Sequence, residues 1–479
     1  MLGNLSRTLR LGLVLVPFSL TLQGCDFLEN LLRDILEGLL QRCGNVDSEG
    51  NYPPLRVTTT EDLRDQYCTA TSCSLQSAIY THNFCGGRRT IILTKDAEYV
   101  VSGSEVAEET GGRAFPAIRG RLTIMGNGAT IRANPGPDTP FRLFYTYPPT
   151  EFTLDNVTLA DGLARRRVSP RPFDHHANYG GAIYNHGRLT LRNVSLVNNR
   201  AQTKGGAIYN RGNLVTEGST IRNSNSSALY NEEGATATIN ATIFSNNENL
   251  DLGGSGGAIW NFGTLDVNQS EFFDNRTSGH GGAISSSSTM SISRSTIANN
   301  AASDGGGIHA LVLAGATGAR VAIIGSTLSS NTATSIGAAI IATGAVTVDL
   351  RDVTIAANTA TSPGGGAINI SGGARWTIGN TLFVENPGGN CGIAEPVTTS
   401  SNNLSSDASC GAAAPIAAGL TVEALAANGG PTQTHALPAG SPAIDAGTRC
   451  EATDQRGEPR PRDGNGDGVA ACDVGAFER

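Results

Sequence analysis

The sequence is poor in charge and in large side chains. Charged residues make up 16% of the 479 positions and aromatic residues 5%, whereas charged residues alone usually account for about 25%. A chain with so few bulky side chains is not suited to one conventional globular core. Lysine stands at two positions, Lys95 and Lys204, and the net charge is −8. The basic footprint of nucleic-acid binding is therefore absent, and we expect no nucleic-acid partner.

Small residues are abundant instead. The chain has 60 glycines and is 39% hydrophobic, which is too hydrophobic for a disordered, highly charged polymer. No G-X-Y period is present, so collagen is excluded. These features predict an architecture that packs small residues in many short, repeated layers.

The N-terminus lacks an apolar run long enough to cross a bilayer. Residues 11–22 are apolar and follow Arg7 and Arg10 without any acid, but a membrane span needs about 20 residues. This pattern predicts a secretory signal peptide over residues 1–24. The signal ends in Leu22-Gln23-Gly24-Cys25, which resembles the bacterial lipoprotein signal, although Gln23 departs from it. The resemblance implies an exported protein with a diacylated Cys25, anchored in the cell envelope at the outer membrane or cell surface. The alternative is an ordinary signal peptide beside a chance cysteine.

Residues 25–67 are predicted to form a tether with one amphipathic helix. Leucine and isoleucine follow one helical stripe through residues 27–42. This helix could lie on the bilayer or cap the N-terminal end of the domain. We favour the cap, because the opposite face carries acids as well as arginines.

Cysteine is missing from the middle of the chain. Once Cys25 is set aside, eight cysteines remain, four before and four after the repeats, which in an exported protein predicts disulfides. They are Cys43, Cys68, Cys73, Cys85, Cys391, Cys410, Cys450 and Cys472. We expect pairing within the loops 391–410 and 450–472. For the first four, Cys68–Cys73 with Cys43–Cys85 is one of three connectivities that the sequence allows. The absence of CxxC and of clustered histidine disfavours a metal site.

Two sequence anchors repeat between residues 180 and 386. The first reads Gly-Gly-Ala-Ile, followed in several copies by an aromatic residue and Asn, as in Gly180–Asn185 and Gly205–Asn210. The second is a short strand-like segment that ends in Asn-Asn, as in Asn193–Asn199. The mean step is about 26 residues, which is too short for a propeller blade and lacks the leucine-rich pattern. We predict an all-β, right-handed parallel β-helix with a short N-terminal helical segment, whose coils stack about 4.8 Å apart.

Asparagine recurs at two turns of this predicted coil, where side-chain ladders between coils are expected. One candidate ladder is Asn185, Asn210, Asn231 and Asn261; the other is Asn199, Asn247, Asn275, Asn300, Asn331 and Asn358.

Three stretches resemble modules of bacterial surface proteins. Cys73–Ile79 is similar to the CSLREA motif, the GGAI repeats look like those of chlamydial polymorphic outer-membrane proteins, and residues 428–478 resemble the choice-of-anchor Q module. The last match rests on Asn428–Leu437, Ser441–Gly447, Asp454–Gly457 and Cys472–Glu478. The resemblance implies a cell-surface β-helix, which we place at residues 68–390, followed by a disulfide-containing C-terminal module at residues 391–479.

Acids are scarce in the repeats, which disfavours catalysis. Gly279-His280-Gly281 superficially matches a motif of pectin-hydrolysing enzymes, but glycoside hydrolysis needs two carboxylates across the scissile bond. No two acids share a register on adjacent coils, and Asp274 is the acid closest to His280 in the sequence. We therefore predict no catalytic residue and expect a structural role for His280.

Two further groups are candidates for binding. Tyr184, Tyr209, Tyr230 and Trp260 recur at one register, so they would form an aromatic strip for sugar rings if they face outward, or stacked packing if they face a turn interior. Asp463, Asn465 and Asp467 alternate with glycine in a manner that can wrap Ca²⁺, although the Glu expected at position twelve of an EF-hand loop is replaced by Val474.

The predicted function is surface display, adhesion or glycan binding by a lipid-anchored β-helix. Its partners would be the membrane and a polysaccharide or a host or cell-surface ligand, with no required cofactor beyond the candidate Ca²⁺. The alternative is a polysaccharide lyase or glycoside hydrolase on the same fold.

Overall fold

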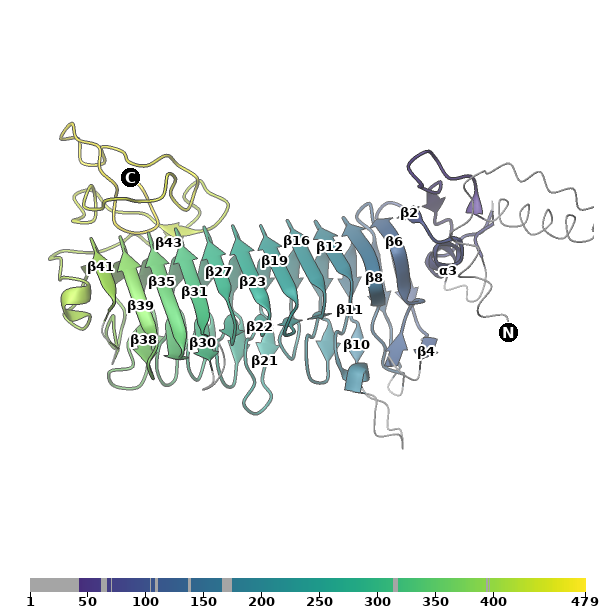
Figure 1. The fold of residues 1–479 in the computed structure, drawn as a ribbon, viewed down its shortest axis with the longest axis horizontal. Helices are drawn as coiled ribbons and strands as arrows, with labels where there is room; N and C mark the ends of the chain where they lie inside the picture. Colours follow the sequence, from purple (N-terminus) through teal and green to yellow (C-terminus); the bar gives the residue numbers. More distant parts are fainter. Residues whose placement is uncertain are drawn as a thin grey trace, which may run out of the picture.

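The computed structural model describes residues 43–479 apart from 62–66, 70, 104, 108–110, 137–138, 166–174, 313–317, 393–394 and 396. The predicted signal peptide, Cys25 and the predicted helix at 27–42 lie outside the described residues. The described chain is an elongated parallel β-helix, as Figure 1 shows, which confirms the predicted fold class.

One coil shows how the sequence builds the solenoid. Strand β11 (Ile183–Asn185) leads through a Gly turn into β12 (Arg188–Arg192), and a turn at Asn193 leads to β13 (Ser195–Val197). A two-residue edge strand, β14 (Arg200–Ala201), closes the coil. We call the three faces that these strands build face I (β11 type), face II (β12 type) and face III (β13 type).

Each face is a parallel sheet in which every strand pairs with its counterpart in the next coil. Face I contains the first part of β8 (Phe144–Asp155), then β11, β15 (Ile208–Asn210), β18 (Leu229–Asn231), β22 (Ile259–Asn261), β26 (Ile284–Ser286), β30 (Ile308–Val312), β34 (Ile340–Gly344) and β38 (Ile368–Ser371). Face II contains β1 (Leu55–Arg56), β2 (Arg88–Ile92), β6 (Ile118–Met125), the last part of β8, β12, β16 (Asn213–Glu217), β19 (Thr236–Asn240), β23 (Thr264–Asn268), β27 (Met290–Ser293), β31 (Ala319–Ile324), β35 (Val346–Arg351), β39 (Arg375–Gly379) and β41 (Thr399–Ser401).

Face III contains β3 (Glu98–Val101), β7 (Thr130–Ala133), β9 (Thr158–Ala160), β13, β17 (Thr220–Arg222), β20 (Ile243–Ser245), β24 (Glu271–Phe273), β28 (Thr296–Ala298), β32 (Thr327–Ser329), β36 (Thr354–Ala356), β40 (Leu382–Val384) and β42 (Leu404–Ser405). The edge strands are β10 (Leu163–Ala164), β14, β21 (Glu248–Asn249), β25 (Arg276–Thr277), β29 (Ala301–Ala302), β33 (Thr332–Ala333) and β37 (Thr359–Ala360). Two antiparallel pairs lie outside the stack: β4 (Glu105–Ala107) with β5 (Gly111–Arg113), and β43 (Leu425–Ala426) with β44 (Thr434–His435). Within the described residues, two 3₁₀ turns complete the elements, His175–Asn178 and Gly411–Ala413.

The interior repeats the same side chains from coil to coil. The Ile or Leu of each GGAI-type anchor is fully buried, as Ile183, Ile208 and Leu229 show, and the register pairs them directly. Phe244 and Phe272 stack inside with ring centroids 5.0 Å apart, which is one coil spacing. Stacking of identical positions therefore forms one continuous core along the whole solenoid.

Both predicted asparagine ladders form, with one interruption. Asn185 donates to Asn210, Asn210 to Asn231 and Asn231 to Asn261, each at 2.8 Å. The second ladder runs from Asn247 through Asn275, Asn300, Asn331 and Asn358 to Asn386, at 2.9–3.0 Å. Asn199 is not part of it, because Ser224 stands between Asn199 and Asn247 at the ladder position.

Helix α3 (Leu75–Cys85) closes the N-terminal end of the core. Ser74 caps it, since its hydroxyl accepts from the Ser77 amide at 3.1 Å, and Leu75 and Ile79 are buried against the first coil. The CSLREA-like stretch is thus a helix start in this chain. The disulfides Cys43–Cys85 and Cys68–Cys73 lie at the two ends of α3 and form one of the three connectivities that the sequence allowed.

The segment from Leu420 to Arg479, which we call the C-terminal segment, folds back over face III. Gln455 is fully buried, donates to Thr296 at 2.9 Å and accepts from Thr327 at 2.7 Å. The Ala476 amide donates to the Thr354 hydroxyl at 3.0 Å. These threonines are one outward column of face III, so the segment is fixed by a row of hydroxyls supplied by successive coils.

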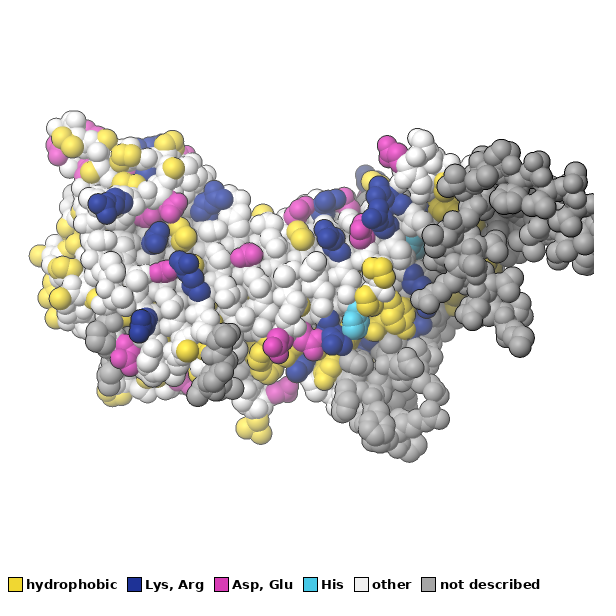
Figure 2. Space-filling view, in the orientation of Figure 1, with side chains coloured by type: hydrophobic (Ala, Val, Ile, Leu, Met, Phe, Trp, Pro, Cys, Tyr) yellow, Lys and Arg dark blue, Asp and Glu magenta, His cyan; other side chains and the backbone are white. Residues whose placement is uncertain are grey.

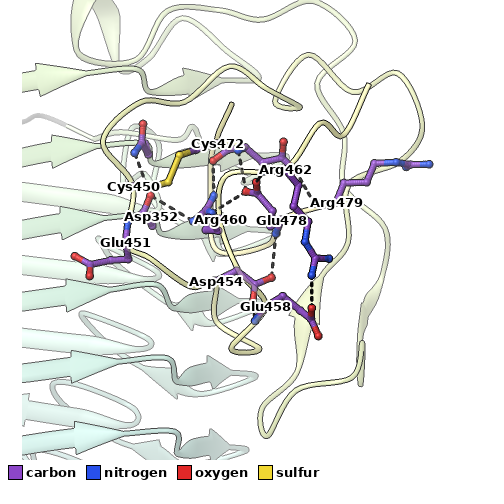
Figure 3. A network of polar contacts seen from close by, with 12 residues as sticks. Asp352, Cys450, Glu451, Asp454, Glu458, Arg460, Arg462, Cys472, Glu478 and Arg479 are labelled. Carbon is purple, nitrogen blue, oxygen red and sulfur yellow. Dashed lines mark hydrogen bonds and ion pairs between the residues drawn. A yellow bond between two sulfur atoms is a disulfide. The ribbon is translucent and has the colours of Figure 1, made fainter. Parts of the chain in front are cut away.

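A buried ion-pair network holds the same segment together (Figure 3). The Nε of Arg460 lies 2.7 Å from a carboxylate oxygen of Glu478, and its Nη1 lies 3.4 Å from Asp352, which belongs to the solenoid. Asp454 binds Arg456 at 2.7 Å, and that guanidinium covers the ring of Phe477. Several residues of the motif at 454–478 therefore serve to dock the segment onto the coils.

The remaining two disulfides are Cys391–Cys410 and Cys450–Cys472, again as the spacing suggested. Figure 2 shows that the upper edge of the molecule is hollowed between the C-terminal segment and the N-terminal end, with charged side chains scattered over the visible face. Among the described residues, none of the helices has the length and apolar character that a membrane span requires.

Candidate functional site

The aromatic register predicted from the sequence lies on the outside of face I. In β11 the side chains of Ile183 and Asn185 point into the lumen, so the middle residue, Tyr184, points outward. The parallel register aligns this position in successive coils; it is occupied by Tyr145, Tyr184, Tyr209, Tyr230 and Trp260. We call these five residues the aromatic strip.

The rings of the strip pack mainly on one another. Their centroids are 4.8 Å apart for Tyr184 and Tyr209 and 5.1 Å for Tyr209 and Tyr230, close to the coil spacing. As a result Tyr184, Tyr209 and Tyr230 are at most 5% exposed. The strip is thus both outward-facing and stacked. Sugar rings can reach the half-buried Trp260, which ends the stack, more readily than the faces of the tyrosines.

Polar groups fix the edge of the strip. Tyr184 bonds to Arg211, which forms an ion pair with Glu232. Lys204 donates to the Tyr230 hydroxyl at 3.0 Å, and its ammonium lies 4.3 Å from the centre of that ring. Burial raises the pKa of the Tyr184 and Tyr230 phenols and lowers the pKa of Lys204. The phenols therefore stay neutral at physiological pH and act as hydrogen-bonding groups.

Two open hollows lie one after the other along the turns that join faces I and II, and we call the two together the groove. The hollows hold about 490 and 520 Å³; the first ends at Gly212 and Asn213, and the second begins one coil later at Glu233 and Gly234. The first is lined by Gly120, Arg121, Pro148, Pro149, Thr150, Glu151, His186, Gly187, Arg188, Gly212 and Asn213. The second is lined by Glu233, Gly234, Phe262, Gly263, Thr264, Ser287, Ser288, Thr289, Gly318 and Ala319.

Glycine forms much of the groove floor because the coils approach closely there. A Cβ on Gly187 would lie 2.4 Å from the carbonyl oxygen of Thr150, and one on Gly212 would lie 2.0 Å from that of Gly187. The floor is therefore backbone, and the rim carries half-buried rings such as His186 and Phe262. Sequence reasoning missed this groove, although the Gly that follows each of β11, β15, β18 and β22 was a usable signal.

The acids of the groove do not form a hydrolytic pair. Among the described lining residues, the carboxylates are Glu151 and Glu233. The strand register aligns Glu151 with Arg188, Asn213 and Thr236 in the next three coils, and Glu233 lies in the turn just before Thr236. Glu151 and Glu233 are therefore about 14 Å apart along the axis, which is three coil spacings. Glycosidases need carboxyl groups about 5–9.5 Å apart. Glu151 is also paired with Arg121 at 3.1 Å.

His280 lies near the far end of the strip and pairs with Asp304 rather than Asp274. Its Nδ1 is 3.3 Å from a carboxylate oxygen of Asp304, and its ring stacks on His309 at 4.7 Å. Burial lowers the pKa of His309 to about 4. The separation of 24 residues between His280 and Asp304 equals the repeat step from Ile284 to Ile308, so this pairing was visible in the repeat spacing.

The loop with Asp463, Asn465 and Asp467 satisfies its own oxygens. Asp463 accepts from the amides of Gly466 at 2.7 Å and Gly468 at 2.9 Å, and Asp467 accepts from Val469 at 2.8 Å. Among the described residues, no three His, Cys, Asp or Glu side chains are grouped so as to hold a metal ion. Calcium binding by this loop stays a prediction of the sequence.

Comparisons with known proteins concern the fold. A family model described as a right handed beta helix region matches residues 180–352, in agreement with the predicted handedness. The crystal structure of pectate lyase Pel9A is similar with a TM-score of 0.43 and 15% identity, covering 89% of this chain and 96% of that one. No curated protein matches the sequence significantly.

Proposed function

We propose that the protein is an exported cell-envelope protein whose β-helix binds a polysaccharide along the groove between faces I and II. It would serve surface display or adhesion without catalysis. The observation that carries this proposal is the groove itself, which follows the solenoid axis from Gly120 to Ala319 and is bordered by half-buried aromatic rings.

The shape of the groove favours a linear polymer over a small molecule. Small-molecule sites are concave and enclose most of the ligand, whereas this groove is shallow and extends over several coils. Its backbone floor lets a sugar ring approach, while the half-buried Phe262 supplies an apolar ring at the rim, with the ring of Trp260 packed next to it. The separation of its two carboxylates supports binding over hydrolysis.

Tryptophan fluorescence offers a direct test. The chain has two tryptophans: Trp260 is half-buried on the strip, and Trp376 is 2% exposed inside the solenoid. We expect polysaccharides that bind on a glycan array to shift the emission of Trp260 and to protect it from iodide quenching. The double variant W260A/F262A should lose array binding while its thermal unfolding stays close to that of the wild type.

The matched control is Phe273→Ala, which removes a half-buried aromatic ring from face III. F273A should bind like the wild type. Binding that persists in W260A/F262A, or the absence of any glycan ligand, would contradict the proposal. Shortened products in a depolymerisation assay, lost on substitution of Glu151 or Glu233, would favour the enzyme instead.

The envelope location is tested at Cys25. We expect globomycin, which blocks lipoprotein signal cleavage, to make the precursor accumulate, and Cys25→Ser to release the protein from the membrane fraction. If C25S stays membrane-bound, the lipid-anchor proposal fails.

A further inference from the structure

One coil departs from the repeat and leaves a polar notch at the edge of face III. The step from Ile208 to Leu229 is 21 residues, shorter than the others. Edge strand β14 pairs back to β10, and the next edge strand in the chain, β21, starts a separate sheet. Both β10 and β21 lie along the lower edge of the solenoid in Figure 1.

Side chains replace the missing edge strand in this short coil. Asn225 Oδ1 accepts from the Ala201 amide at 2.8 Å, and the Ser226 hydroxyl donates to the Ala201 carbonyl at 3.0 Å. Ser226 and Ser227 adopt positive φ angles of 51° and 58°, which turn the chain into the next coil without an edge strand.

The same coil interrupts the asparagine ladder. Ser224 occupies the position held by Asn199 in the preceding coil and by Asn247 in the following one. Its amide still donates to Asn247 Oδ1 at 3.0 Å. Ser224 is 2% exposed, yet within the described structure its hydroxyl has no hydrogen-bond partner. A buried hydroxyl without a partner costs free energy, and an Asn would satisfy this position as it does in the neighbouring coils.

The resulting notch holds about 510 Å³ and is lined by Arg200, Asn223, Ser224, Asn225, Asn246 and Glu248. Arg200 lies one coil before Ser224 and Glu248 one coil after it, so about 10 Å separates the two along the axis. The described residues supply no ion-pair partner for the Arg200 guanidinium, whereas Glu248 lies 4.0 Å from Arg276.

We propose that this notch is a binding site for a single uronic-acid unit of a polysaccharide. The Arg200 guanidinium would take the carboxylate in a two-pronged contact. The amides of Asn225 and Asn246 and the Glu248 carboxylate would take the ring hydroxyls. The span between Arg200 and Glu248 leaves room for one sugar ring with a hydrogen bond on either side. The site lies on a different face from the groove and does not depend on it.

Monosaccharide binding to the purified domain tests this proposal. We expect glucuronate to bind in saturation-transfer NMR and calorimetry, and glucose to bind at least about fivefold more weakly, because a charge-assisted hydrogen bond contributes more than a neutral one. Arg200→Gln should weaken glucuronate binding by about tenfold. The matched control Arg222→Gln removes an exposed arginine from the next coil, which carries Ser224, and should bind within about twofold of the wild type.

Substitution of Ser224 separates a binding role from a structural one. Ser224→Asn completes the ladder and fills the notch, so we expect a higher Tm together with loss of glucuronate binding. Ser219→Ala is the control, because Ser219 is equally buried but its hydroxyl accepts from the Val194 amide and donates to the Glu217 carbonyl at 3.1 Å. S219A should lower the Tm and leave binding intact.

Several results would overturn the proposal. They are no glucuronate binding to the wild type, equal binding of glucose, and wild-type binding by R200Q or S224N. The groove variant W260A/F262A should keep glucuronate binding, so failure of the groove proposal and failure of the notch proposal can be told apart.

Discussion

Beyond the first coils, the solenoid has two consecutive parts that share one interior and differ on the outside. We call residues 139–268 the aromatic half and residues 269–405 the covered half. The inward column of face I is Ile or Leu in both, from Ile183 to Ile368. The outward column changes from Tyr184, Tyr209, Tyr230 and Trp260 to Ser285, His309, Ile341 and Asn369.

This difference follows from how stacked coils restrain each position. An inward side chain packs against the same position in the coils on both sides, so a change in its size is felt twice. An outward side chain also meets its counterparts in the neighbouring coils, but it has no packed lumen above it, so a change in its size can be accommodated on the outer side. Outward positions are therefore where one coil can differ from the next without loss of the fold, and function is best sought there.

Face III shows the same contrast. In the covered half its outward threonines bind the C-terminal segment, as Thr296 and Thr327 bind Gln455. In the aromatic half the corresponding residues are Ser195, Thr220 and Ile243, and the hydrogen bonds of the described C-terminal segment begin at Glu271. The described C-terminal segment thus docks on face III of the covered half, and its described hydrogen bonds do not extend to face III of the aromatic half.

Arg460→Met should produce the largest difference in behaviour between the covered half and the aromatic half. The change leaves Glu478 and Asp352 buried without their cation, and breaking such a buried pair costs about 3–5 kcal/mol. We expect the C-terminal segment to detach and become sensitive to proteases, while hydrogen exchange in the aromatic half stays as in the wild type. Arg462→Met is the control, because that half-exposed arginine pairs with half-exposed Glu458 and should contribute at most about 1 kcal/mol. Equal protease sensitivity of R460M and R462M would show that the network does not hold the segment.

The docking of the C-terminal segment should also depend on pH through Asp473. Burial raises the pKa of Asp473 to about 6 from 3.8, so the folded state holds this proton more tightly than the unfolded state. Protonated Asp473 therefore contributes up to about 3 kcal/mol to the free energy of unfolding. This contribution is fully present below about pH 4 and is lost as the pH rises through about 6. Burial also raises the pKa of Asp352 and therefore acts in the same direction, whereas burial lowers the pKa of His435 and opposes it.

The test compares protection of the C-terminal segment in hydrogen exchange at pH 4.5 and pH 7. The protection of this segment should increase from pH 7 to pH 4.5, and the increase should be larger in the wild type than in Asp473→Asn. Asp467→Asn, in the exposed loop nearby, should keep the wild-type profile. The assignment to Asp473 is wrong if D473N retains the full pH dependence.

The repeats made the fold predictable, but they did not predict every contact between residues. Ile spacing and recurring Asn indicated the coils and both ladders, because stacked positions must satisfy one another locally. The exposure of the Tyr209 ring could not be predicted, because the same outward register leaves the ring either exposed or covered by neighbouring rings. Gln455 and Thr327 lie 128 residues apart, and no pattern in either stretch indicates their contact.

The notch was harder to predict from the sequence for a related reason. The 21-residue step to Leu229 was apparent in the sequence, but that this shortening removes an edge strand follows from the hydrogen bonds of Asn225 and Ser226 in three dimensions. The groove was hard to predict for the same reason. Gly187 and Gly212 indicated tight turns in the sequence, but only the stacking of these turns in adjacent coils shows that they form one backbone floor.

The smallest expected effect is a difference in stability between two ladder turns. Asn247 in the aromatic half and Asn358 in the covered half each accept an amide at 3.0 Å, and each donates to a strand carbonyl and to the next Asn of the ladder. Asn→Ala at either site leaves buried polar groups unpaired and should cost about 1–3 kcal/mol. The two turns differ in two contacts, because Asn358 also accepts from the Asn331 side chain at 2.9 Å and donates to the Ala356 carbonyl at 3.0 Å, whereas Asn247 follows Ser224 and begins its ladder. We therefore expect N358A to lower stability in urea unfolding by about 1 kcal/mol more than N247A. A larger gap would mean that the outer surface of a half, including its cover, stabilises the turns beneath it, and the two halves would then differ inside as well as outside.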